Sequence, residues 1–173
     1  MTEPMTTRVE VWPVAADEAG IWLLSGADAW RPNLPVPADS EPHAEVELAL
    51  AQNGASEGVA LLHSTSWRVD GPTVVLTYVA AIRPRGLVLD AWPDAKPVSL
   101  ELAEAIGPAT PHGPAEVPTP SYAHVLLHAL RHLAFLRDTD ATSRQAFDRN
   151  WLRHLDRLNP ALAGMYDVEQ HAA

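Results

Sequence analysis

The chain contains no cysteine, which excludes disulfide bonds and thiolate ligands for metal or redox chemistry. No uncharged run approaches the ~20 residues that cross a bilayer, and the first ten residues lack the apolar run of a signal peptide. Glycine-rich phosphate-binding loops and the G-x-S-x-G elbow of serine hydrolases are also missing. We therefore expect a cytoplasmic protein with no membrane partner.

Basic residues are scarce in the first two thirds of the chain. The net charge is −10, and residues 1–120 hold 16 acidic and 6 basic side chains, whereas residues 121–173 hold six of each. An acidic body disfavours nonspecific binding to nucleic acids, so no nucleic-acid partner is expected. With 173 residues, 47% of them hydrophobic and 20% charged, the chain is long enough and apolar enough for one globular core.

Two β-rich runs, 59–69 and 73–82, flank the turn-forming residues Asp70-Gly71-Pro72, and this pattern predicts a β-hairpin. Pro72 has no N–H to give to a strand ladder. We therefore expect a four-residue loop, 69–72. In this register Trp67 lies opposite Val74 on a mostly apolar, buried face.

The same register places His63 opposite Tyr78, with Thr65 nearby on the buried face. A buried histidine beside a tyrosine is either a hydrogen-bonded core pair or part of a small-molecule pocket. His63, Tyr78 and Thr65 are accordingly the predicted ligand-binding residues.

The N-terminal part before this hairpin contains two short strands, a loop and a helix. The helix is expected to begin at the capping residue Ser40 and to stop at Gly54, with an apolar arc lying on the sheet. The predicted bounds are 8–14 and 21–24 for the strands of an N-terminal hairpin, 25–39 for a proline-broken loop and 40–54 for the helix. The expected apolar arc comprises Ala44, Val46, Leu48, Leu50 and Ala51.

Beyond the hairpin, half of the 16 prolines fall within residues 84–120, and this composition predicts a connector. Two amphipathic helices follow, joined by a short link that favours an antiparallel pair. The predicted bounds are 87–89 for a short strand, 99–106 for a short helix, 107–119 for a polar connector, and 119–137 and 140–159 for the helical pair. We therefore predict an α+β domain over residues 1–118, with the proline-rich connector at 84–120, and a C-terminal helical pair, 119–173, packed on the same domain.

The order hairpin, loop, capped helix and strand–turn–strand over residues 8–106 resembles the Nudix hydrolase family. The signature of that family reads G-x5-E-x7-R-E-U-x-E-E-x-G-U, where U is a bulky aliphatic residue. When Gly54 is aligned with its second glycine, Asp39 falls at the first glutamate. The three helix glutamates are replaced by Leu48, Ala51 and Gln52. The resemblance implies a Nudix-like mixed sheet packed with helices.

The family holds Mg²⁺ or Mn²⁺ with those glutamates, and hard cations need oxygen ligands that leucine and alanine do not have. We therefore predict a Nudix-like protein without that metal chemistry, without catalytic residues and without a cofactor, which binds a small molecule or a protein. The alternative is a divergent Mg²⁺-dependent phosphohydrolase acting on a nucleoside diphosphate derivative, with Asp39, Glu41 and Glu45 as metal ligands. An exposed acidic helix face explains Glu41 and Glu45 equally well.

A third reading is an interaction module in which the C-terminal helices form a homodimer. Phe147, Trp151 and Leu155 would then supply the surface, unless they pack on the sheet. Histidines also recur every four residues on the first of these helices, at His124, His128 and His132. This spacing is compatible with a zinc site, although a polar outer stripe is the interpretation we favour because no H-E-x-x-H pattern accompanies it.

Overall fold

The computed structural model describes residues 4–99 and 122–162, with side chains from Val125 onward in the second segment. The strands are β1 (Thr6–Ala16), β2 (Ile21–Leu23), β3 (Val59–Asp70), β4 (Thr73–Ile82) and β5 (Lys96–Pro97). The helices are α1 (Pro42–Gln52), the 3-10 turn η1 (Ser56–Gly58), α2 (Val88–Ala91), α4 (Tyr122–Thr139), α5 (Ala141–Ala146) and α6 (Arg149–Leu155). None of the helices within these residues is long and apolar enough to cross a membrane.

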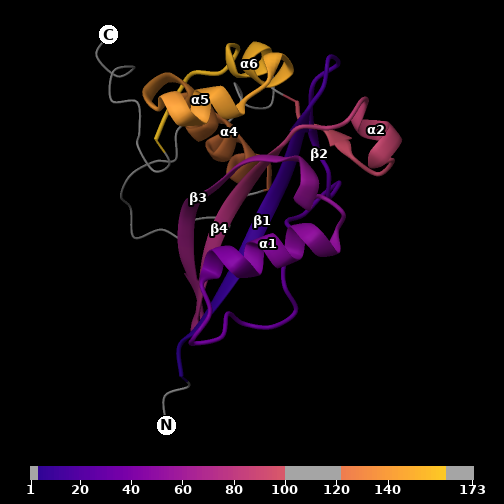
Figure 1. The fold of residues 1–173 in the computed structure, drawn as a ribbon. Helices are drawn as coiled ribbons and strands as arrows, with labels where there is room; N and C mark the ends of the chain where they lie inside the picture. Colours follow the sequence, from indigo (N-terminus) through magenta and orange to yellow (C-terminus); the bar gives the residue numbers. More distant parts are fainter. Residues whose placement is uncertain (1–3, 100–121, 163–173) are drawn as a thin grey trace, which may run out of the picture.

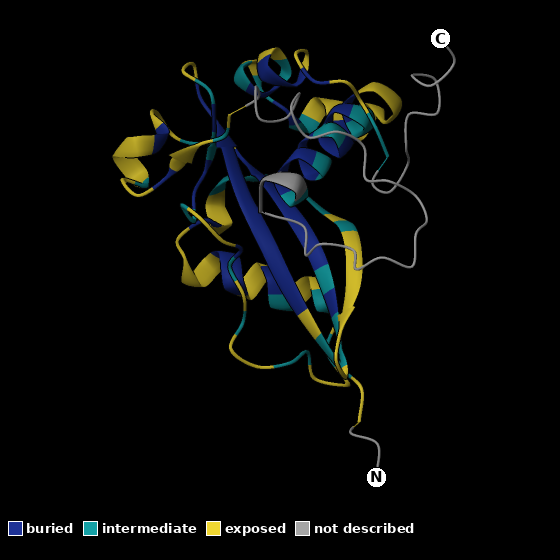
Figure 2. Cartoon of the chain, turned by 180° about the vertical axis from the view of Figure 1, so that it is seen from behind, coloured by how far each residue is buried: buried dark blue, intermediate teal, exposed yellow. Residues whose placement is uncertain are grey.

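The strands form one mixed sheet in the order β3-β4-β1-β2-β5. β1 and β2 form the predicted antiparallel N-terminal hairpin, whereas β1 runs parallel to β4 along ten paired positions. The long central pair, β1 and β4, is buried on both faces (Figure 2). A mixed sheet with helices on it confirms the α+β class.

Helices cover both faces of the sheet, with α1 on one face and α4 to α6 on the other (Figure 1). Side chains alternate along each strand, so neighbouring residues of β1 supply opposite cores. Val9 and Val11 face α1, and Trp12 and Val14 face the C-terminal helices. A single apolar cluster joins these helices to the sheet. It includes Leu126, Leu130, Leu133, Phe147, Trp151 and Leu155.

The predicted second C-terminal helix is wrong as one continuous element, because it divides at Phe147. Asp140 caps α5 as expected, but Asp148 caps α6 separately by accepting hydrogen bonds from the backbone N–H groups of Asn150 and Trp151. Phe147, Trp151 and Leu155 are 5%, 0% and 0% exposed. They are buried against the sheet, so they cannot supply the dimer surface considered above.

The helix before the hairpin forms, but its beginning and its packed face differ from the prediction. Glu41, not Ser40, occupies the N-cap position and makes no side-chain capping bond. The Ser40 hydroxyl instead donates to Glu45 Oε1 at 2.9 Å. Gly54 takes the left-handed conformation expected of a helix stop, with φ of 72°. The buried stripe is narrower than predicted and consists of Val46, Ala49 and Leu50, while Ala44, Leu48 and Ala51 are exposed.

The register predicted for the β3–β4 hairpin is wrong from the turn as far as Leu61: the pairing differs by two positions next to the turn and by one position beyond the bulge at Thr65. Asp70 pairs with Thr73, so the loop has two residues, Gly71 and Pro72. With φ of 57° at Gly71 and the fixed negative φ of proline, this loop matches a type II′ turn. Pro72 sits inside the loop and pairs with nothing across the hairpin, which removes the objection to a tight turn. Its carbonyl accepts a hydrogen bond from the Thr6 N–H at 2.9 Å.

The expected short strand at 87–89 is also wrong, because Val88–Ala91 forms one turn of helix. Asp17 organises this turn, since one of its carboxylate oxygens accepts the Val88 N–H at 3.1 Å and the other accepts the Trp22 indole N–H at 2.9 Å. The predicted helix at 99–106 and connector at 107–119 lie outside the described residues, apart from Ser99.

Candidate functional site

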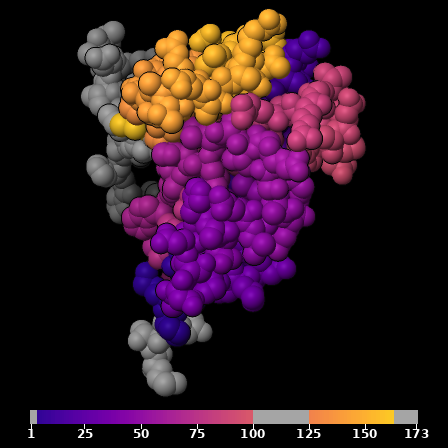
Figure 3. Space-filling view, viewed as in Figure 1, coloured from indigo at the N-terminus to yellow at the C-terminus, as the bar shows by residue number. Residues whose placement is uncertain are grey.

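The outer half of β3, residues 64–70, is exposed along almost its whole length. Six of its seven residues are exposed, whereas residues 59–63 of the same strand are half-buried (Figure 2). Trp67 and Val69 are 68% and 56% exposed, although Trp67 was expected on a buried face. In the space-filling view this end of the hairpin lies at the margin of the molecule, near the start of β1 (Figure 3). Within the described chain β3 is the edge strand at one end of the sheet.

The turn determines which backbone groups of β3 point outward. In a two-residue hairpin the flanking residues, here Asp70 and Thr73, form a hydrogen-bonded pair. Because such pairs alternate with non-hydrogen-bonded ones, the backbone N–H and C=O of Val69 and Trp67 point away from β4. The two residues with exposed apolar side chains therefore also carry outward-facing backbone groups.

Helix α1 ends its coverage of the sheet before reaching these residues. Its first turn packs at Tyr78, where the His43 ring lies 6.2 Å from the tyrosine ring in an edge-to-face arrangement. Trp67 lies opposite Leu76 and Val69 opposite Val74, closer to the turn and beyond the helix. A regular, uncovered segment thus extends from Ser66 to Asp70. It is bounded at one end by the turn and at the other by a bulge between Ser64 and Ser66.

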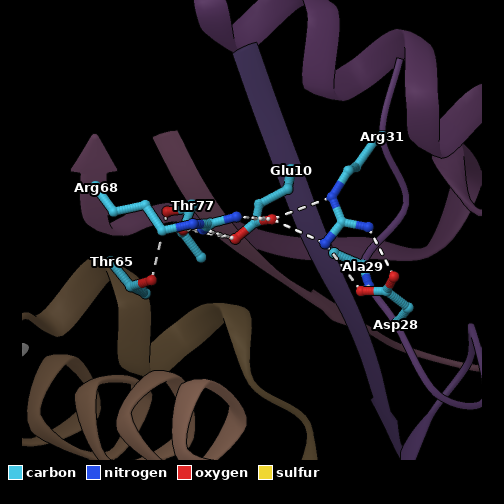
Figure 4. A network of polar contacts seen from close by, with 7 residues as sticks. All are labelled: Glu10, Asp28, Ala29, Arg31, Thr65, Arg68 and Thr77. Atoms are coloured by element: carbon cyan, nitrogen blue, oxygen red, sulfur yellow. Dashed lines mark hydrogen bonds and ion pairs between the residues drawn. The ribbon is translucent and has the colours of Figure 1, made fainter. Parts of the chain in front are cut away.

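A buried carboxylate fixes this half of the strand to the sheet (Figure 4). Glu10, only 1% exposed, accepts hydrogen bonds from Arg68 Nη2 at 2.9 Å, from Arg31 Nη2 at 3.1 Å and from the Thr77 hydroxyl at 2.8 Å. Asp28 binds the other side of Arg31 at 2.8 Å. We call Glu10, Thr77, Arg68, Arg31 and Asp28 the Glu10 network.

The charges of the Glu10 network balance, with two carboxylates facing two guanidinium groups. Burial opposes ionisation of Glu10, but the hydrogen bonds from Arg68 and Thr77 and the charges of both arginines outweigh it, so the pKa of Glu10 lies below its usual value. Binding to Glu10 raises the pKa of Arg68, which is held as a cation. A neutral, satisfied network of this kind positions the loop before α1 and strand β3, and leaves no net charge for a ligand.

His63 lies in the inner half of β3 and faces α4, not Tyr78. Its ring stacks on His132 with centroids 4.7 Å apart and an angle of 21° between the planes. Burial lowers the pKa of His63, and burial together with the nearby His63 lowers the pKa of His132. The predicted polar outer stripe is therefore wrong for His132, which is 7% exposed, and the side chain of His124 is not described.

The predicted trio of His63, Tyr78 and Thr65 does not come together. Ser64, not His63, lies opposite Tyr78, because the two-residue turn shifts the register by two positions and the bulge at Thr65 reverses only one of them. Tyr78 consequently faces α1, while His63 faces α4. The Thr65 hydroxyl donates to the Thr77 carbonyl at 3.4 Å. The three residues therefore do not line a common site.

The carboxylates proposed as metal ligands are also dispersed. Asp39 and Glu41 are exposed, and Glu45 is half-buried and accepts the Ser40 hydroxyl. Over residues 4–99 and the described part of 122–162, no three histidine, aspartate or glutamate residues are placed to hold a metal ion. Nor does α1 offer carboxylates at the positions where the Nudix signature has them.

Comparisons with known proteins give no relative, since no family model, no curated protein and no solved structure matches this chain. The resemblance to Nudix hydrolases therefore remains a prediction drawn from the order of elements.

Sequence reasoning missed the Glu10 network. The signal available was a single charged residue, Glu10, inside the apolar run from Val9 to Val14. A buried glutamate needs a cationic partner, but Arg31 and Arg68 are 21 and 58 residues away in sequence. The bridge between Val11 and Trp30 brings Arg31 to Glu10, and the pairing of β4 with both β1 and β3 brings Arg68 to it.

Proposed function

We propose that this protein is a non-catalytic binding domain, with a Nudix-like α+β scaffold, that recognises a polypeptide by pairing with the outer edge of β3. The observation that carries this proposal is that Trp67 and Val69 combine exposed apolar side chains with outward-facing backbone groups. A strand added at an open sheet edge gains affinity from main-chain hydrogen bonds and specificity from alternate side chains.

The Glu10 network supports this function by keeping the edge rigid. Arg68 lies between Trp67 and Val69 in the strand and is bound by two guanidinium nitrogens to the buried Glu10 carboxylate. A segment already ordered before binding loses less conformational entropy when a partner pairs with it. The binding edge is therefore ordered before the partner binds.

Features that protect edge strands limit the site to a short length. Natural edges are commonly shielded by bulges, charges and prolines, and here the bulge at Thr65 and the turn at Pro72 enclose only Ser66–Asp70. This segment suits a short extended peptide.

Residue types in α1 support a binding function over metal chemistry. The positions aligned with the three family glutamates are Leu48, Ala51 and Gln52, and all three side chains are exposed. Only Gln52 has a side-chain oxygen, and one amide oxygen does not replace three carboxylates for Mg²⁺.

Selection of extended peptides from a phage-displayed library tests the proposal. Enriched peptides should lose binding to Val69→Pro, which removes an outward N–H, and should retain it with Val69→Thr, which keeps that N–H and a β-branched shape. Circular dichroism of both variants checks that the fold persists. A library that yields no enriched peptide, or peptides that bind Val69→Pro as well as the original chain, contradicts the proposal.

A further inference from the structure

We infer that the peptide recognised at this edge is a basic, amphipathic strand, with apolar residues beside Trp67 and Val69 and a lysine or arginine beside Asp70. This inference rests on the proposed function, because it names the chemistry of the partner that pairs with the same edge.

The two faces of the edge segment Ser66 to Asp70 differ in polarity. Trp67 lies opposite Leu76, which packs in the apolar cluster under α1, so Trp67 and Val69 project on the α1 face of the sheet. The polar residues of the segment project on the other face. A strand paired beside Trp67 and Val69 places alternate side chains next to them, and apolar residues at those positions extend the α1 cluster.

On the polar face, the arginine is already paired and the aspartate is not. Arg68 turns away from the open edge and crosses β4 to bind Glu10 on β1, with its Nη2 2.9 Å from the carboxylate (Figure 4). Asp70 is exposed, and within the described chain its carboxylate makes no ion pair and accepts no hydrogen bond. Arg8 is exposed on the same face, but it belongs to β1, two strands away from the edge. The unpaired charge at the edge itself is therefore negative.

The surroundings of the edge are acidic as well. Burial and the charge of Glu41 raise the pKa of Tyr78, which lies opposite Ser64, so this glutamate lies near the bulged end of the segment. Residues 32–67, which include α1, the loop before it and most of β3, contain no lysine or arginine. Their five carboxylates are those of Asp39, Glu41, Glu45, Glu47 and Glu57. An acidic surface of this kind attracts cationic peptides and disfavours anionic ones.

Backbone pairing and charge have different roles in this recognition. An exposed ion pair contributes little by itself, so main-chain hydrogen bonds and apolar contacts supply most of the affinity. The charges discriminate between peptides, because they favour basic sequences and repel acidic ones. Since these charges are exposed, added salt should reduce the discrimination.

Two synthetic peptides of equal length test the expected charge of the partner. In one peptide valine alternates with lysine, and in the other valine alternates with glutamate. Fluorescence anisotropy measures their binding to the whole chain at low ionic strength. The lysine peptide should bind at least ~10-fold more tightly, and this preference should shrink as salt is added. Equal affinities, or tighter binding of the glutamate peptide, overturn the inference.

Two variants with the same change in net charge locate the contact. Asp70→Asn, which keeps a residue suited to the turn, should weaken binding of the lysine peptide by ~3-fold. Asp94→Asn is the control, because Asp94 is an exposed carboxylate two residues before β5, the strand at the other end of the sheet. This control should change the affinity by less than ~1.5-fold. Equal effects of the two variants mean that binding follows the overall charge, and they overturn the inference.

The Val69 variants separate this inference from the proposed function. Binding of the lysine peptide that Val69→Pro abolishes and Val69→Thr retains supports both. If library peptides lose binding to Val69→Pro but carry no excess of lysine and arginine, recognition at the edge is upheld and its basic partner is overturned. If neither a library peptide nor the lysine peptide depends on the Val69 N–H, both proposals fail.

Discussion

The inner and outer halves of β3 belong to one strand with one hydrogen-bonded neighbour, but they differ in what covers their side chains. Residues 59–63 pack under α1 on one face and beside α4 on the other, where His63 meets His132. Residues 64–70 extend beyond both helices, and Glu10 is the chief tie between this half and the sheet. The inner half is thus held by apolar packing and the outer half by a buried ion network.

Because of this difference, we expect the inner half of β3 to contribute to stability and the outer half to binding. Apolar burial stabilises the inner half at ~25 cal/mol per Å², so truncations in its covering helices should lower the free energy of unfolding substantially. Substitutions of exposed outer residues should leave the fold intact and change only what binds.

Truncating a buried side chain of the C-terminal helices should cause the largest loss of stability. Trp151 is fully buried, and its indole N–H donates to the Ile82 carbonyl at 2.9 Å. Trp151→Ala should lower the free energy of unfolding by ~3–5 kcal/mol, because it leaves a cavity and an unpaired carbonyl. The matched change Trp67→Ala, at an exposed position, should cost no more than ~0.5 kcal/mol. Urea unfolding followed by circular dichroism measures both, and similar costs would refute the difference between the halves.

Neutralising Glu10 should cause the next largest loss of stability. Glu10→Gln keeps the side-chain shape but removes the charge that binds Arg31 and Arg68, and we expect a loss of ~2 kcal/mol in unfolding free energy. Glu57→Gln, which breaks the exposed pair with Arg85, is the control and should change stability by less than ~0.5 kcal/mol. If both variants melt alike, the network does not hold the outer half.

Acidification should weaken the inner half through its histidine pair. The pKa values of His63 and His132 are lowered in the folded state, so the unfolded chain binds more protons below the usual value of 6.5. Stability from this pair is complete above that pH and is lost as pH falls through the folded-state values. Thermal melts between pH 7.5 and pH 5.5 should show this decline, and His63→Gln should flatten it. A decline of equal slope in the variant would assign the effect to other groups.

Apart from the control variants, Val69→Pro should have the smallest effect on stability. Its N–H points away from β4, so the proline removes no bond of the β3–β4 ladder, and we expect a change within ~1 kcal/mol. Thermal melting measures this change, with Val69→Thr as the reference. A large loss of stability would mean that the Val69 N–H already has a partner.

Local patterns predicted the elements well and their packing less well. Strand propensity located both long strands of the hairpin, and the caps at Asp140 and Gly54 located helix ends. The two-residue loop Gly71-Pro72 was missed because a tight turn was considered only at Asp70-Gly71, where it would have paired Pro72, and the loop was lengthened to 69–72 to avoid that pair. The bulge at Thr65 then separated His63 from Tyr78, and no local pattern indicated it.

Contacts between distant segments explain the remaining differences. The parallel pairing of β1 with β4 joins residues more than sixty positions apart and places Glu10 opposite Thr77, while the β3–β4 hairpin brings Arg68 to the same carboxylate. The exposure of Trp67 likewise depends on where α1 begins, which its periodicity does not fix. The alternation of apolar and polar residues along β3 therefore could not predict that residues 64–70 are mostly exposed while residues 59–63 are half-buried.

Backbone amide exchange, measured by NMR, tests most directly whether the outer edge of β3 is open for pairing. In dilute solution the amides of Trp67 and Val69 should exchange rapidly while those of Ser66 and Arg68, which face β4, stay protected. Protection of all four amides in dilute solution would mean that the edge is already covered, and would contradict the account.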